Sequence, residues 1–194
     1  MPVKSNTRSL ALSRIARYSR RGFTLIELMA VVVIVGILSV AGVALFRKQV
    51  LASKGSEAVS VIQAIRSAQE AYLAENRVYL NVSTDNSGRA WYPNPAPNTT
   101  RYAWVQDGHP DYLRWRALAP PVNRTVIFGY LVNAGEAGTN VPALQLQTPP
   151  TFASPMVLGW YTIQARGDVN GNGISATYAA SSLNSELVVE NEGE

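Results

Sequence analysis

The 194-residue sequence contains no cysteine and a single histidine, His109. The lack of cysteine excludes disulfide bonds, thiolate metal sites and a cysteine nucleophile. One histidine is too few for a histidine-rich metal site. Charged residues are also scarce, at 15% against 47% hydrophobic residues, a balance too apolar for a disordered chain. The composition therefore predicts a folded protein without thiol or histidine-based metal chemistry.

Proline is absent between residues 3 and 92, and acidic residues are absent from the first 21 positions. This basic leader carries six positive charges, at Lys4, Arg8, Arg14, Arg17, Arg20 and Arg21. The rest of the chain has eleven basic and thirteen acidic residues. The sequence pI of about 9.5 thus reflects the leader, and the overall charge gives no argument for a nucleic-acid partner.

An apolar run of 24 residues, Phe23–Phe46, follows the leader and contains one ionisable side chain, Glu27. As a helix it would measure about 36 Å, enough to cross a bilayer. The upstream positive charges predict that residues 1–22 stay in the cytoplasm and that the remainder is exported. Cleavage after Ala44 as a secretory signal is the alternative. The run is longer than a usual signal and carries a carboxylate, which favours a retained membrane span.

Glu27 is the most informative residue of this run. A charged carboxylate at the centre of a membrane helix costs about 2.5–3.5 kcal/mol, and less near an end, where it can reach the headgroups. Its surroundings, Arg-Arg-Gly-Phe-Thr-Leu-Ile-Glu-Leu over residues 20–28, favour a specific role. They resemble the processing site of type IV prepilins and pseudopilins, in which a basic leader ends in Gly before Phe and a long apolar helix.

The resemblance implies cleavage after Gly22 by a prepilin peptidase, N-methylation of Phe23, and assembly of the exported chain with other pilins on an inner-membrane platform. Cleavage would create an α-amine with a reference pKa near 8 on Phe23. Glu27 lies about one helical turn away. In a filament, the Glu27 of a neighbouring subunit could neutralise this amine, which would relieve two buried charges and set the register. Glu27 is therefore the candidate assembly residue.

Residues 47–80 become amphipathic, with an apolar stripe at helical spacing (Leu51, Ala58, Ile62, Ile65, Ala68 and Tyr72). We expect one helix from Thr24 to Tyr79, embedded in the membrane first and packed on a globular head second. After Arg89 the composition changes, because ten of eleven prolines and all four tryptophans lie there. Residues 81–99 are typical of an irregular connector. The pattern predicts an α+β fold in which an antiparallel sheet, within an exported head of residues 81–194, packs on the long helix.

Five segments of the head are predicted strands on their apolar, aromatic and β-branched content. They are Arg101–Val105, Tyr112–Leu118, Thr125–Val132, Val157–Arg166 and Leu187–Glu190.

No sequence motif of a known catalytic or phosphate-binding site is present, so we expect no enzymatic activity and no cofactor. His109 lies in a turn sequence and is expected to be solvated. The tryptophans and the nearby Arg101, Arg114, Arg116 and Arg124 could form an exposed face for single-stranded DNA. The interpretation we favour places the aromatic side chains in the core.

The segment Asp168-Val169-Asn170-Gly171-Asn172-Gly173 matches the first half of a calcium loop. The match then fails, because alanine stands where the bidentate glutamate belongs, and only Glu186 or Glu190 could fold back to complete a site. A tight turn is the favoured interpretation, and no metal site is predicted. Without a disulfide, either this turn or an ion has to hold the C-terminal region against the sheet.

The sequence thus predicts a structural subunit of a type IV pilus-like filament. We expect a single-pass inner-membrane precursor that contacts membrane lipid before assembly, and later a pilus at the cell surface or a periplasmic filament. Within the family, the alternatives are a pseudopilin of a type II secretion system and a minor pilin with a DNA- or surface-binding head. Outside it, the alternative is a membrane-anchored binding module that keeps its leader.

Overall fold

The computed structural model describes residues 22–83 and 91–193, without the side chains of residues 44 and 48. It divides into two compact units, residues 1–42 and 43–194, which are considered separately below. Most of the basic leader, residues 1–21, lies outside the described residues.

One helix, α1 (Leu25–Asn76), supplies residues to both units. It begins at a capping box formed by Thr24 and Glu27. It ends three residues before the predicted Tyr79, because Arg77 takes a left-handed conformation (φ 64°) and donates its N–H to Leu73 O at 2.8 Å. The buried Gln69 side chain then holds the departing chain through both backbone groups of Leu80, at 2.8 and 3.0 Å.

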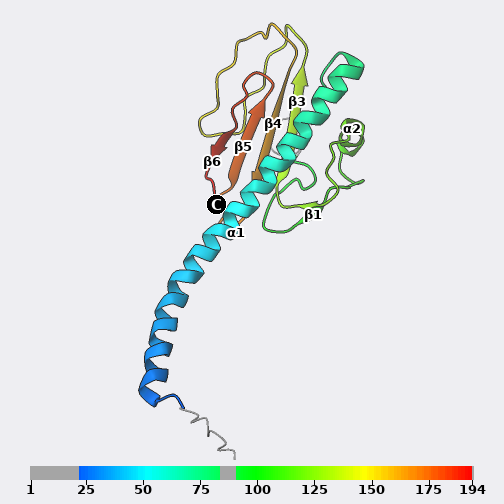
Figure 1. Ribbon diagram of the computed structural model, residues 1–194. Helices are drawn as coiled ribbons and strands as arrows, with labels where there is room; N and C mark the ends of the chain where they lie inside the picture. The colour runs from blue at the N-terminus through cyan, green and yellow to red at the C-terminus, as the bar shows by residue number, and fades with distance from the viewer. Residues whose placement is uncertain (1–21, 84–90, 194) are drawn as a thin grey trace, which may run out of the picture. The chain divides into compact units, whose positions relative to one another are not determined.

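The second unit is built on a four-stranded antiparallel sheet in the order β3-β4-β5-β6. The strands are β3 (Gly129–Gly135), β4 (Trp160–Gly167), β5 (Ala176–Ser181) and β6 (Val188–Glu190). A small sheet pairs β1 (Tyr102–Ala103) with β2 (Thr125–Val126), and a short helix, α2 (Tyr112–Leu118), lies between them in the sequence. Figure 1 shows the second half of α1 packed across the four-stranded sheet. The predicted α+β architecture is confirmed.

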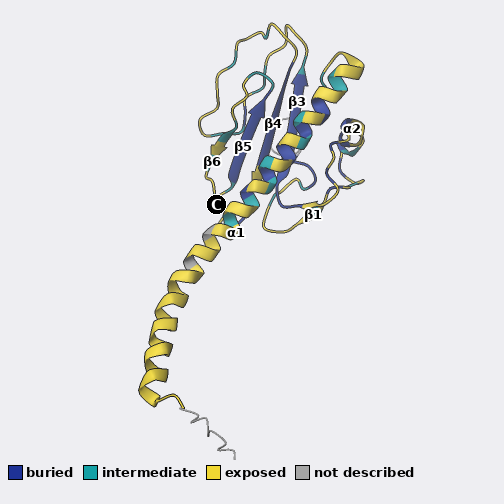
Figure 2. Ribbon diagram, in the orientation of Figure 1, coloured by how far each residue is buried: buried dark blue, intermediate teal, exposed yellow. Residues whose placement is uncertain are grey.

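The core lies between α1 and one face of this sheet, as the buried ribbons of Figure 2 indicate. Register places Val132 beside Ile163, and Ile163 beside Ala180, so their side chains share a face. They belong to one buried cluster with the predicted helix stripe, in which Ile62 and Ile65 are fully buried. The amphipathic pattern of residues 47–80 therefore identified the face of α1 that packs on the head.

The opposite sheet face is covered by the connection between β3 and β4. Gln145 N–H donates to the buried side chain of Gln164 at 2.6 Å, and Leu144 of the same loop is buried. The Glu190 carboxylate of β6 accepts the backbone N–H groups of Gln147 and Thr148 at 2.8 and 2.9 Å. Because both faces are covered, β3 to β5 are apolar or small along nearly their whole length.

The two outer strands of the sheet differ, because β3 has further backbone partners and β6 is short. Along β3, Val82 and Ser83 donate their backbone N–H groups to Val132 O, and Tyr92 exchanges two backbone hydrogen bonds with Tyr130. The Ser83 hydroxyl accepts from Val132 N–H at 3.0 Å. At the other side, β6 contains three residues only.

Several predicted strands need correction. The segment Tyr112–Leu118 is helix α2, and its buried Trp115 and Leu118 are three residues apart, as a helical face requires. Strand β5 was not predicted. Arg101–Val105 contributes only the two residues of β1, and Val157–Arg166 begins as a strand at Trp160. Leu187–Glu190 corresponds closely to β6.

The predicted strand Thr125–Val132 is interrupted at residues 127 and 128, between β2 and β3. Here the Ile127 N–H donates to the Glu57 carboxylate of α1 at 2.7 Å rather than to a neighbouring strand. The contact to the helix therefore separates the small sheet from the large one.

Candidate processing and assembly site

The residues of the predicted processing site lie at the start of α1. Gly22, Phe23 and Thr24 have no regular secondary structure and are exposed. The Thr24 N–H and hydroxyl both donate to Glu27 Oε2, each at 2.9 Å, and Glu27 N–H donates to Thr24 Oγ1 at 3.3 Å. The structure thus places Glu27 within the first turn and ties its carboxylate back toward Phe23. One of its two oxygens accepts both of these hydrogen bonds.

The first unit has no packed core in the described residues 22–42. All of these side chains are exposed, including the leucine, isoleucine and valine residues from Leu25 to Val40. By length and composition, α1 is apolar enough to cross a membrane. A helix that is apolar on all sides needs an apolar environment from outside its own unit, either lipid or other helices.

The aromatic residues of the head are core residues rather than a binding platform. All four tryptophans are buried, and Trp104 and Trp115 pack edge to face with ring centroids 5.2 Å apart. Tyr92 stacks on Trp115 at 5.0 Å. The favoured sequence interpretation is confirmed, and these tryptophans are not available for stacking on nucleic-acid bases.

Three of the four arginines that could have formed a DNA-binding face contact other residues of the second unit. Arg101 pairs with Glu57 at 2.7 Å, Arg114 pairs with Asp111 at 3.2 Å, and Arg124 donates to Ser60 Oγ at 3.2 Å. The arginines therefore tie the region between residues 91 and 128 to α1 and to itself.

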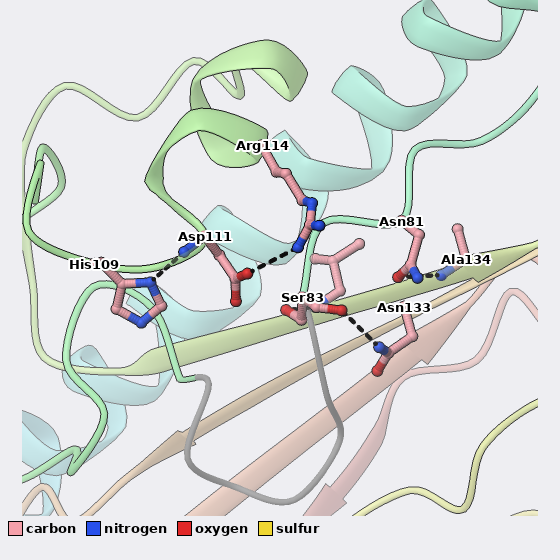
Figure 3. A network of polar contacts seen from close by, with 8 residues as sticks. Asn81, Ser83, His109, Asp111, Arg114, Asn133 and Ala134 are labelled. Atoms are coloured by element: carbon pink, nitrogen blue, oxygen red, sulfur yellow. Dashed lines mark hydrogen bonds and ion pairs between the residues drawn. The ribbon is translucent and has the colours of Figure 1, made fainter.

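His109 is buried, with 8% of its surface exposed, so the expectation that it is solvated is wrong. Its Nδ1 accepts the Asp111 N–H at 3.1 Å, and its Nε2 lies 3.2 Å from Trp91 O, so the neutral ring satisfies both contacts with the proton on Nε2. Burial lowers the pKa of His109, and this outweighs the opposite effect of Asp111. Figure 3 shows this network continuing from Asp111 to Arg114.

The Asp168–Gly173 segment is a series of side-chain-stabilised turns. Asp168 accepts the N–H groups of Gly171 at 2.7 Å and Gly173 at 3.0 Å, while Asn170 and Asn172 each accept an N–H two residues further on. Gly171 and Gly173 have positive φ angles, as such turns require. Glu190 does not fold back to this loop but binds Gln147 and Thr148.

Side-chain contacts also hold the C-terminal region where a disulfide is lacking. Asn191 Nδ2 donates to Ser175 O at 3.3 Å, and Arg66 Nη2 of α1 lies 3.4 Å from both Ser181 O and Asn184 O. These contacts, with the pairing of β5 and β6, connect the turn, the sheet and the helix.

The sequence did not predict the contacts of two polar residues of α1. Glu57 accepts from both Arg101 and Ile127 N–H, and Gln69 binds Leu80. Glu57 was visible only as a charge on the helix, and no local sequence signal links it to a backbone group 70 positions away.

Two comparisons with known proteins found similarities. The family model described as "Prokaryotic N-terminal methylation motif" matches residues 17–43. The type IV major pilin protein PilA of Myxococcus xanthus (strain DK1622) is 39% identical over 74 residues, which are 37% of this chain. The match spans about a third (34%) of that protein's length. No solved structure matches the chain.

Proposed function

From the methylation-motif match and the similarity to a type IV major pilin, we propose that this chain is a type IV pilin and a structural subunit of a type IV pilus-like filament. The observation that carries the proposal is the methylation motif at the head of a helix whose apolar side chains are exposed all around within its own unit. Such a helix can be solvated by lipid before assembly and by other subunits afterwards.

In this proposal, a prepilin peptidase cleaves after Gly22 and the new N-terminus of Phe23 is methylated. Both residues lie before the first helical residue, Leu25, in exposed backbone that an enzyme can reach. The leader remains cytoplasmic until cleavage, because its six positive charges oppose transfer across the membrane. The exported head then faces outward while the helix awaits assembly on an inner-membrane platform.

Glu27 is proposed to set the position of each arriving subunit. Its carboxylate is held on the first turn by Thr24, so its position is defined before assembly. The amine of Phe23 on a neighbouring subunit, positive near neutral pH, is the complementary charge. Apolar helices gain little by meeting one another in lipid, and a charge pair therefore discriminates between registers that packing alone would accept.

The fate of the leader tests the processing step. Intact mass and N-terminal sequencing should be measured on the protein from native membranes and from sheared filaments. Methylated Phe23 in the sheared fraction is expected for a pilus subunit. Methylated Phe23 in membranes alone would instead indicate a pseudopilin or a minor pilin. An intact leader, or cleavage after Ala44, would contradict the proposal.

Three variants separate the charge of Glu27 from its role in the helix cap. Glu27→Ala removes both, whereas Glu27→Gln keeps a capping side chain and removes the charge. Thr24→Ala keeps the charge and weakens the cap, at about 1 kcal/mol for the first turn. We expect normal processing in all three, and loss of filaments in both Glu27 variants only. Glu75→Ala, at an exposed position near the end of α1, is the control for charge removal. Wild-type filament yield from processed Glu27→Gln would refute the charge pair.

A further inference from the structure

A groove lies at the start of the second unit, where the chain leaves the apolar run. It has a volume of about 530 Å³ and is formed by one stretch of α1 and two loops. The helix contributes Phe46, Arg47, Val50, Leu51 and Lys54, and the loops contribute Thr99, Val169 and Asn170. Phe46 is 70% exposed although it is among the largest apolar residues of the unit. The groove is therefore an open apolar surface immediately after the predicted membrane span.

The charges at this groove are all positive. Arg47 and Lys54 line it, and no acidic residue does. Lys54 Nζ donates to Val169 O at 2.6 Å, which holds the ammonium group at the groove while two of its three N–H donors remain for other partners. Asp168 is adjacent in sequence, but its carboxylate already accepts two backbone N–H groups.

Two other carboxylates belong to neighbouring parts of the unit. Glu57, one turn beyond Lys54, is bound to Arg101 and Ile127 N–H. Glu192 is exposed near the C-terminus, where its charge adds to the rise in the pKa of Tyr178 that burial causes. Neither lines the groove, so the positive charge within it has no matched counter-charge among its described lining residues.

We propose that this groove binds an anionic phospholipid of the membrane from which the precursor protrudes. The inference rests on the proposed membrane-inserted stage and adds a second lipid contact, made by the head. Phe46, Val50 and Leu51 would cover the upper part of an acyl chain, and Arg47 and Lys54 would bind the phosphate. From Phe46 to Lys54 the helix rises about 12 Å, which is enough to cross the headgroup region of one leaflet.

Both the charge and the position of the groove favour lipid over a second copy of the chain. The outer-facing leaflet is present as soon as the span is inserted, and the groove follows the span within the same helix. Basic residues close to an anionic surface each strengthen binding by about fivefold. Within its membrane span, residues 23–46, a second copy carries a single ionisable side chain, Glu27, so this helix offers little negative charge to the groove.

The lack of cysteine allows a unique fluorescent label at any chosen site. The full chain should be reconstituted, one copy per disc, in nanodiscs of phosphatidylcholine with and without phosphatidylglycerol. Thr99→Cys places the label in the groove, Leu113→Cys places it on the exposed face of α2, and Ile34→Cys reports insertion of the span. Quenching by headgroup-labelled lipid measures contact of positions 99 and 113 with the membrane surface, and quenching by lipid labelled on its acyl chains measures burial of position 34 in the bilayer.

We expect quenching at position 99 to be stronger in the discs that contain phosphatidylglycerol, while position 113 stays unquenched in both. Arg47→Gln should weaken the docked state about fivefold, and Lys54→Gln should do the same. The control Arg116→Gln removes an exposed charge from α2 and should leave quenching unchanged. Arg47 makes no recorded hydrogen bond within the described residues, so this variant does not depend on a folding contact.

The other possible results separate the groove proposal from the proposed membrane-inserted stage. Quenching at position 34 without any at position 99, or equal quenching at position 99 in both lipids, would overturn the groove proposal and leave the filament function intact. If quenching at position 99 is lost when each disc holds two chains, the groove binds a second copy, and the lipid proposal would also be overturned. A lack of quenching at position 34 would overturn the membrane-inserted stage itself.

Discussion

The two units use the same helix in opposite ways. Residues 25–42 expose their apolar side chains on every side, whereas residues 58–68 bury Ala58, Ile62 and Ile65 against a sheet. Backbone hydrogen bonding is the same in both, so the difference lies in what solvates the side chains. In the second unit the partner surface is part of the chain itself. In the first, no partner is present within the described residues, and the apolar surface has to be completed from outside.

The largest expected effect comes from replacing one isoleucine in each unit by alanine. Ile62→Ala creates a cavity in the head core and should lower its free energy of unfolding by about 2–5 kcal/mol. Ile34→Ala removes an exposed side chain and should leave the unfolding of the head unchanged. Urea unfolding of both variants in detergent, followed by tryptophan fluorescence, measures the difference. Equal destabilisation by the two variants would contradict the division into units.

Glu57 connects α1 to the small sheet and its surroundings. Its loss should therefore lower the free energy of unfolding of the head without creating a cavity in the core. Glu57→Ala leaves the Ile127 N–H without its acceptor, and we expect a loss of about 1–3 kcal/mol. Arg101→Ala should cost about 1 kcal/mol or less, because this partner is half exposed. The two variants can be compared by the same urea unfolding. A larger effect of Arg101→Ala would show that the ion pair, rather than the backbone contact, is the main tie.

At Gly55, α1 lies close to a side chain of strand β5. A Cβ at this position would lie 2.5 Å from the hydroxyl oxygen of Tyr178, which is buried and has no hydrogen-bond partner in the described structure. Gly55→Ala should destabilise the head by about 1–2 kcal/mol, because overpacking exceeds the gain in helix propensity. Adding Tyr178→Phe should reverse this loss. No recovery in the double variant, measured by thermal unfolding, would place the clash elsewhere.

Mildly acidic pH should affect the stability of the head, because the single histidine lies there. The folded pKa of His109 is lowered by burial below its unfolded value near 6.5. Its contribution to stability is therefore complete above about pH 6.5 and is lost as pH falls toward the lower folded pKa. A fall in melting temperature of a few degrees between about pH 7 and 5.5 is expected. His109→Asn should flatten this profile; an unchanged slope would assign it to carboxylates.

The parts of the fold that could be predicted are those with a long, regular pattern. The apolar run and the helix stripe with Ile62 and Ile65 extend over many turns, and both led to α1. Short elements were predicted wrongly where the residue composition favours a different secondary structure from the one that forms. Tyr112–Leu118 has the aromatic content of a strand, yet its buried residues follow a helical period. Strand β5 is rich in alanine, which has low strand propensity, and was missed because only its position between β4 and β6 defines it.

The polar contacts were harder to predict because they join distant residues. His109 occupies a turn, as its neighbours suggest, but the chain at Trp91 closes over it from 18 positions away. The residues at the start of α1 could be proposed as a processing site because the motif is continuous in sequence. That Glu27 caps the helix through Thr24 follows from their spacing of three, which the sequence analysis did not use.

The two borders of the four-stranded sheet have a consequence for solubility. An open strand edge is a template on which identical chains add one another into amyloid-like aggregates. Here the second unit closes one border with Val82, Ser83 and Tyr92, and shortens the other to the three residues of β6. For a chain that we propose to polymerise through its helix, this arrangement of the sheet opposes a second, uncontrolled polymerisation through strand edges.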